Sequence, residues 1–76
     1  MKLTKETRDY VKIGTLLRGD SESYMVTNIW EAGKGKCITV KIMEMSDPKN
    51  QCWIGHNVYG RPLSEYYGLE VELYER

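Results

Sequence analysis

Histidine and cysteine, two residue types that commonly catalyse reactions or bind metals, are sparse in this sequence. It has one histidine, His56, and two cysteines, Cys37 and Cys52. Their spacing matches no zinc motif, because such motifs bring cysteines and histidines together in close pairs at fixed separations. A single histidine also leaves little acid–base capacity near neutral pH. We therefore expect no metal site, no cofactor and no enzymatic activity, and we expect His56 to be a partly buried strand residue.

One glycine-rich segment invites comparison with phosphate-binding loops. Gly33-Lys34-Gly35-Lys36 lacks the full spacing of a P-loop and does not connect a strand to a helix. Its lysines and free amide groups are nevertheless suited to touching a phosphate. If the protein binds nucleic acid, the expected phosphate contacts are Lys34, Lys36 and Lys41.

Aromatic side chains with a polar edge are the most unusual feature of the composition. The chain has six Tyr, two Trp and no Phe. A core has no need of this bias, because Phe packs well there, whereas Tyr and Trp are favoured at binding surfaces. The expected binding residues are Tyr24, Trp30, Met43, Trp53, Tyr59, Pro62, Tyr66 and Tyr67.

The overall composition favours one small domain without a strong electrostatic field. The 76 residues leave room for one domain, and 11 basic residues balance 11 acidic ones. Zero net charge weakens the case for non-specific nucleic-acid binding, which depends on a basic field. Two cysteines are too few for a disulfide framework, and charges interrupt every candidate signal peptide or membrane span. We therefore expect a cytoplasmic protein with free thiols and no membrane association.

The elements that must position these residues are mostly short strands. Residues 1–9 are weakly patterned and predict a flexible or short-helical arm, followed by a barrel domain at 10–76. Strands are expected at 10–18, 24–30, 37–45, 51–59 and 69–74, where apolar residues alternate or β-branched and aromatic residues gather. Loops are expected at 19–23, 31–36 and 46–50. The segment Pro62–Tyr67 predicts one helical turn, since Pro pre-sets its start and Gly68 can end it.

The sequence leaves open which face of the strand at 24–30 is buried. The expected core face of the next strand is Ile38, Val40 and Ile42. The length of the intervening loop favours pairing Ile29 with Ile38. The outward side chains would then include Tyr24, Val26, Trp30 and Met43. A slip of one residue would instead bury the first three of these, because strand side chains alternate between faces.

The order of these elements resembles that of the SH3-like small β-barrels, a group that includes SH3, Tudor-type and KOW-type modules. The architectural resemblance covers about residues 10–75. Within it, the segment 60–66 (Gly-Arg-Pro-Leu-Ser-Glu-Tyr) is similar to the Pro…Tyr turn before the last strand of peptide-binding SH3 domains. The resemblance implies an all-β fold: a small five-stranded SH3-like barrel with one short 3-10 turn before the last strand. It also implies that Pro62 and Tyr66 line a ligand groove.

Three functions remain open from the sequence. The leading one is a non-enzymatic protein-binding module, an adaptor, regulator or small inhibitor of a larger protein, that buries Tyr and Trp anchors in its partner. The alternative is a nucleic-acid-binding small barrel whose aromatic side chains stack on bases while the three lysines contact phosphates. The third is small-ligand binding at the seam of a homodimer, which exposed strand edges would support.

Overall fold

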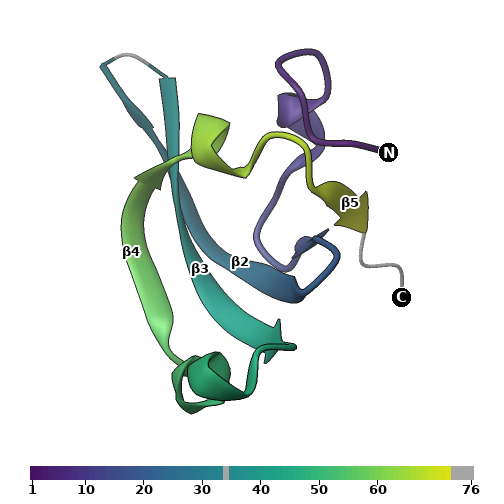
Figure 1. The fold of residues 1–76 in the computed structure, drawn as a ribbon. Coiled ribbons are helices and arrows are strands. Elements are labelled where there is room, and N and C mark those ends of the chain that lie inside the picture. The colour runs from purple at the N-terminus through teal and green to yellow at the C-terminus, as the bar shows by residue number, and fades with distance from the viewer. Residues whose placement is uncertain (34, 73–76) are drawn as a thin grey trace.

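The computed structural model describes residues 1–33 and 35–72. Within them the chain forms five strands and three short 3-10 helices (Figure 1). The strands are β1 (Leu16–Arg18), β2 (Glu22–Ala32), β3 (Gly35–Met45), β4 (Asn57–Pro62) and β5 (Glu70–Glu72). The helices are η1 (Arg8–Tyr10), η2 (Pro48–Trp53) and η3 (Leu63–Tyr66). No helix in this part of the chain is long and apolar enough to cross a membrane.

All five strands belong to one antiparallel sheet with the order β4-β3-β2-β1-β5. The prediction of an all-β, five-stranded fold is confirmed. β2 and β3 form a long curved hairpin, and η3 follows β4 and precedes β5, which lies beside β1 (Figure 1). β4 and β5 do not pair with each other, so over the described residues the sheet does not close into a barrel.

The N-terminal segment continues the sheet beyond β5. Lys2 forms an antiparallel bridge with Glu70. The Leu3 amide donates to the Leu69 carbonyl at 2.7 Å, and the Gly68 amide donates to the Leu3 carbonyl at 2.8 Å. The Leu3 side chain is fully buried. The first three residues are therefore packed against the last strand of the sheet.

The hydrophobic core lies on the inner face of the curved sheet, between the long hairpin and the segments that carry η3, β5 and the N-terminus (Figure 1). The predicted core face of β3 is confirmed, because Ile38, Val40 and Ile42 are all buried. Each such side chain contributes about 1.5–3 kcal/mol by leaving water. The core cluster consists of Leu3, Val11, Leu17, Val26, Ile38, Val40, Leu63, Tyr66 and Val71.

A β-bulge in β2 determines which side chains of this strand are buried. Ile29 pairs with Ile38, as predicted. The register then shifts at Thr27, so that Val26 pairs with Val40, where an uninterrupted register from the Ile29–Ile38 pair would place Thr27. Because one extra residue is inserted, the side chains before the bulge lie on the opposite face from the one that simple alternation assigns to them.

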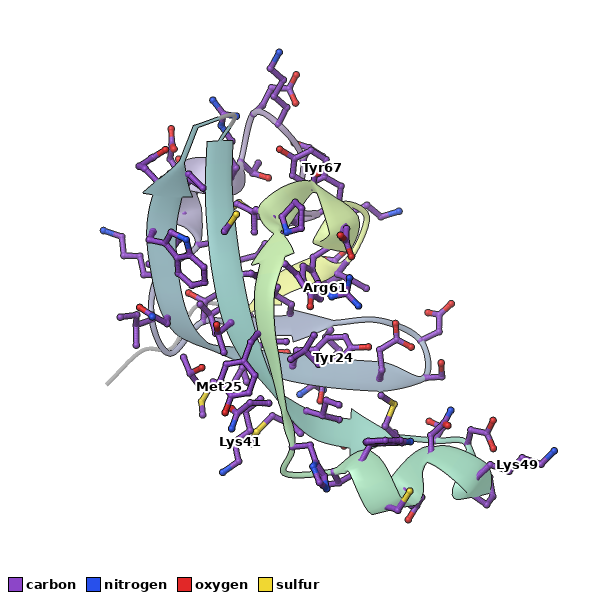
Figure 2. All side chains as sticks on the ribbon, turned by 90° about the vertical axis from the view of Figure 1, so that its left-hand side faces the viewer. Tyr24, Met25, Lys41, Lys49, Arg61 and Tyr67 are labelled. Carbon is purple, nitrogen blue, oxygen red and sulfur yellow. The ribbon has the colours of Figure 1, made fainter. Side chains whose placement is uncertain are left out.

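The bulge corrects the predicted orientation of two side chains. Of the two orientations that the sequence left open, the one that points Tyr24 and Val26 outward is not found, since Val26 is fully buried and Tyr24 packs against the core. Trp30 lies on the other side of the bulge and keeps its predicted outward position, with 38% of its surface exposed. Figure 2 shows Tyr24 on one side of the strands and Met25 on the other.

Several predicted element boundaries differ from those of the structure. The strand predicted at 10–18 begins only at Leu16, because Gly14 adopts a positive φ of 95° in the turn before it. Most of the loop predicted at 31–36 is strand, since β2 runs to Ala32 and β3 starts at Gly35. The strand predicted at 51–59 begins only at Asn57, and η2 takes its place.

The sequence contains a start signal for η2. The Asp47 carboxylate accepts a hydrogen bond from the Lys49 amide at 2.9 Å, and Pro48 occupies the first position of the helix. This arrangement is typical of helix N-termini. Within the described residues, η1 and η2 are additional to the 3-10 turn predicted before the last strand. The turn predicted before the last strand is confirmed as η3, and residues 73 and 74 of the strand predicted at 69–74 lie outside the described residues.

Candidate functional site

The outer face of β2, β3 and β4 carries a row of large side chains. Trp30 lies opposite Cys37, and Cys37 lies opposite Pro62. Residues directly opposite each other across antiparallel strands share one face. A Cβ added at Gly60 of β4 would stand 3.9 Å from Cζ2 of Trp30. The Trp30 ring therefore reaches across β3 toward β4, over a position that has no side chain.

Two further large side chains are exposed on these strands, Tyr59 on β4 and Met43 on β3. Tyr59 precedes Gly60 in β4 and is 74% exposed, the most exposed large hydrophobic side chain of the described residues. Met43 follows the inward-facing Ile42 in β3 and is itself exposed. We call Trp30, Met43, Tyr59 and Pro62 the outer aromatic surface.

Trp53 lies apart from this surface, on η2. No residue of η2 is buried, and residues 46–57 are exposed throughout. The Trp53 ring meets the His56 ring edge-on, with their centroids 5.5 Å apart. The prediction that His56 is a partly buried strand residue is wrong, because it is exposed in the turn before β4. Within residues 1–33 and 35–72, no three His, Cys, Asp or Glu side chains form a group that could hold a metal ion.

Tyr24 and Tyr66 contact each other on the inner face. Their ring centroids are 5.6 Å apart at an interplanar angle of 70°, an edge-to-face arrangement. Burial raises the pKa of both hydroxyls, and the negative charge of Glu22 raises the pKa of Tyr24 further. The structure places Tyr66 in the core, so it leaves the expected set of surface residues.

Tyr67 and Pro62 line a cavity of about 430 Å³ at the end of the β2–β3 hairpin. Arg8 of η1 and the free thiol of Cys37 line it as well. Tyr66 does not line this cavity. Pro62 and Tyr66, which the SH3-like resemblance places in one groove, therefore do not line the same cavity.

The lysines expected to contact phosphate point in different directions. Lys36 Nζ pairs with Asp9 Oδ1 at 3.1 Å, on the face of β3 that also carries Ile38. Lys41 is exposed on the opposite face of β3, where it lies opposite Met25 of β2 (Figure 2). Lys34 lies outside the described residues.

A second cavity, of about 540 Å³, was not predicted from the sequence. It separates residues 9–13 from the final part of β2, and Ile13 and Trp30 both line it. Ile13 is 64% exposed, although strand alternation had assigned it to a strand. Its neighbour Gly14 was the available signal, because a glycine that supports a turn ends the alternation there.

The outer aromatic surface contains Tyr59, the most exposed large hydrophobic side chain of the described residues, and Trp30, and both are side-chain types often found at the centre of protein interfaces. It lies on rigid, paired strands and ends at β4, which pairs only with β3 over the described residues. No protein-family model, curated protein or solved structure matches this chain, so its function is inferred from the arrangement of its own residues.

Proposed function

We propose that this protein is a non-enzymatic protein-binding module, an adaptor, regulator or small inhibitor of a larger protein, and that it binds through the outer aromatic surface. The observation that carries the proposal is that the Trp30 ring lies over Gly60, the residue that follows the highly exposed Tyr59 in β4. Trp and Tyr supply large contact areas at a low cost in side-chain entropy, and they dominate the energetics of many interfaces.

The position of these side chains also suits an interface. Tyr59 projects from β4, an edge strand, so a partner can cover the ring without displacing another strand. Met43 adds an adaptable side chain to the surface. Lys41 and Asn57, which lie opposite each other on the same outer face, supply a polar border. This combination of aromatic anchors and a polar rim is typical of interfaces between separately folded proteins.

The strand order and the position of η3 immediately before β5 support an SH3-like small barrel as the fold of this module. In this proposal the N-terminal segment, which pairs with β5, is an addition to the barrel. Nucleic-acid binding has less support, because Lys36 is neutralised by Asp9 and Lys41 points away from it.

The proposal is tested by affinity capture from extracts of the source cells, with the full-length protein as bait. The variant is Tyr59→Ser, and the matched control is Tyr10→Ser, which removes another exposed tyrosine, 53% exposed, from η1. Both changes should alter the free energy of unfolding by less than about 0.5 kcal/mol, since both rings are solvated.

We expect a discrete protein to be retained by the wild type and by Tyr10→Ser and to be lost with Tyr59→Ser. Nuclease treatment should leave the capture unchanged. A retained protein that is indifferent to Tyr59→Ser would contradict the proposed surface. Capture that depends on nucleic acid would favour the alternative function, and a wild-type dimer dissolved by Tyr59→Ser would favour the homodimer seam.

A further inference from the structure

One edge of β2 is left open beside the outer aromatic surface. β1 pairs with β2 only as far as Met25, and the last backbone contacts on that side are made by Val26. Beyond Val26, no backbone hydrogen bond within the described residues reaches this edge. The segment 9–13 faces the edge across the cavity of about 540 Å³, which we call the β2 edge groove.

The hydrogen bonding of β2 shows which backbone groups face the groove. The Ile29 amide donates to the side-chain oxygen of Asn28 at 3.0 Å and therefore not to β3. In an antiparallel pair, residues alternate between bonding to the partner strand and pointing away from it. Glu31, two residues further on, must then also direct its N–H and C=O away from β3. The open edge thus offers the Ile29 carbonyl and both backbone groups of Glu31.

The side chains around these groups form an apolar slot. Val11 and Ile13 line it on one side, and Ile29 and Trp30 line it on the other. Ile13 and Trp30 remain 64% and 38% exposed, so both walls are open to solvent. The volume of the groove lies within the usual range for ligand-binding pockets in proteins. Both signs of charge surround it, with Lys36 already paired to Asp9.

We propose that the β2 edge groove takes up an extended segment of a partner protein, which adds to the edge of β2 as a further strand. This inference rests on the proposed protein-binding function and adds that the partner binds through an extended segment. The occupant exchanges two backbone hydrogen bonds with Glu31 and inserts an apolar side chain between Ile13 and Trp30. Because strand side chains alternate, its apolar residues stand at every second position.

Two observations select this occupant. The remaining charged side chains of the rim, Lys12 and Glu31, have no ion-pair partner among the described residues, so a basic residue beside Glu31 and an acidic one beside Lys12 complement the groove. Trp30 belongs to both the groove and the outer aromatic surface, which makes the two parts of one continuous binding region.

The test uses the full-length protein and, as its probe, a displayed library of random peptides of roughly ten residues, long enough to span the strand edge. Selection runs in parallel on the wild type and on Ile13→Asp, which places a charge in the apolar slot at a solvated position. We expect peptides with alternating apolar residues to be enriched on the wild type only. Ile13→Asp should weaken the best peptide at least about tenfold.

Two further variants and one exchange measurement complete the design. Ile13→Leu should retain binding, and Ile54→Asp, which places the same charge at an exposed isoleucine outside the groove, should leave peptide binding unchanged. Hydrogen exchange of the Glu31 amide should slow in the complex, since strand addition gives it an acceptor. Failure to enrich peptides on the wild type over Ile13→Asp would overturn the proposal. So would a bound peptide that leaves the Glu31 amide unprotected.

Strand addition at the β2 edge groove can fail while the proposed protein-binding function stands. If the natural partner is lost with Tyr59→Ser but binds Ile13→Asp normally, the protein-binding function stands and strand addition at β2 is refuted. If the wild type is a dimer that Ile13→Asp dissolves, a second copy of the chain occupies the groove and the proposed occupant is wrong.

Discussion

The clearest structural prediction concerns Leu3, in a segment whose sequence pattern is weak. Leu3→Ala removes a fully buried side chain from the core cluster but leaves the backbone bonds to Leu69 and Gly68 in place. Such a change costs about 2–5 kcal/mol, because transfer energy is lost and a cavity remains. A 76-residue domain has about 4–11 kcal/mol of stability in total. The substitution should therefore remove a large fraction of it.

Urea unfolding followed by circular dichroism measures this loss. We expect the midpoint to fall with an unchanged slope, and the melting temperature to fall by at least about 10 °C. The matched control is Ile13→Ala, which removes a side chain of the same size from a solvated position and should cost less than about 0.5 kcal/mol. If Leu3→Ala costs no more than this control, the N-terminal segment is not docked against β5 in solution and the reasoning is refuted.

Three further predictions follow from the bulge, the tyrosine pair and the cap of η2. Val26→Ala should cost about 2 kcal/mol in urea unfolding because Val26 is fully buried. Thr27→Ala should cost less, because Thr27 is the half-buried bulge residue; the reverse order would mean that β2 pairs without the bulge and Thr27 faces Val40. Ionisation of Tyr24 and Tyr66 should not affect the free energy of unfolding below the ordinary tyrosine pKa of about 10, and it should lower that free energy at higher pH. Burial raises the pKa of both hydroxyls in the folded state, so the unfolded chain releases these protons first. Alkaline absorbance titration should show late-ionising phenols that vanish in the double variant Tyr24→Phe/Tyr66→Phe, and their persistence there would contradict the assignment. Asp47→Ala should speed hydrogen exchange at the Lys49 amide with a loss of about 1 kcal/mol or less in global stability, since η2 is exposed; unchanged exchange would mean that the cap is not formed.

Local sequence patterns predicted much of the fold. The alternation of Ile38, Val40 and Ile42 predicted the buried face of β3, and all three are buried. Pro62 and Gly68 predicted the turn that η3 forms. The fixed φ of proline favours the start of a helix, and a positive φ, which glycine adopts readily, favours its end; Gly68 has a φ of 99°.

Features that depend on distant partners could not be read from local pattern. Leu3 is buried because it pairs with Leu69, near the other end of the chain, and nothing in the polar sequence around Leu3 signals this. The bulge at Thr27 is equally hidden, since an extra residue is identifiable only once the partner strand is known. In η2 a local signal existed in Asp47 and Pro48, but the apolar residues that follow favoured a strand.

The candidate site was predicted only in part, because the positions of some of its residues also depend on distant partners. Trp30 and Tyr59 are exposed as expected. Trp30 follows Ile29 beyond the bulge of β2, and Tyr59 follows Val58, which packs against the core. Tyr66 was assigned to the surface from its resemblance to a groove residue, yet its ring fills the core beside Tyr24. The side-chain type alone does not distinguish these roles, since a tyrosine can serve as core with its hydroxyl at the edge. The β2 edge groove depends on the turn at Gly14, which strand alternation obscured.

The most direct test of the central claim, that the outer aromatic surface binds a protein, is photo-crosslinking in the source cells. A photoreactive phenylalanine derivative replaces Tyr59 in one version of the full-length chain and the exposed Tyr10 in another. We expect one discrete adduct from position 59 that resists nuclease and is digested by protease, and no such adduct from position 10. Equal adducts from both positions, or an adduct at position 59 that nuclease removes, would contradict this claim.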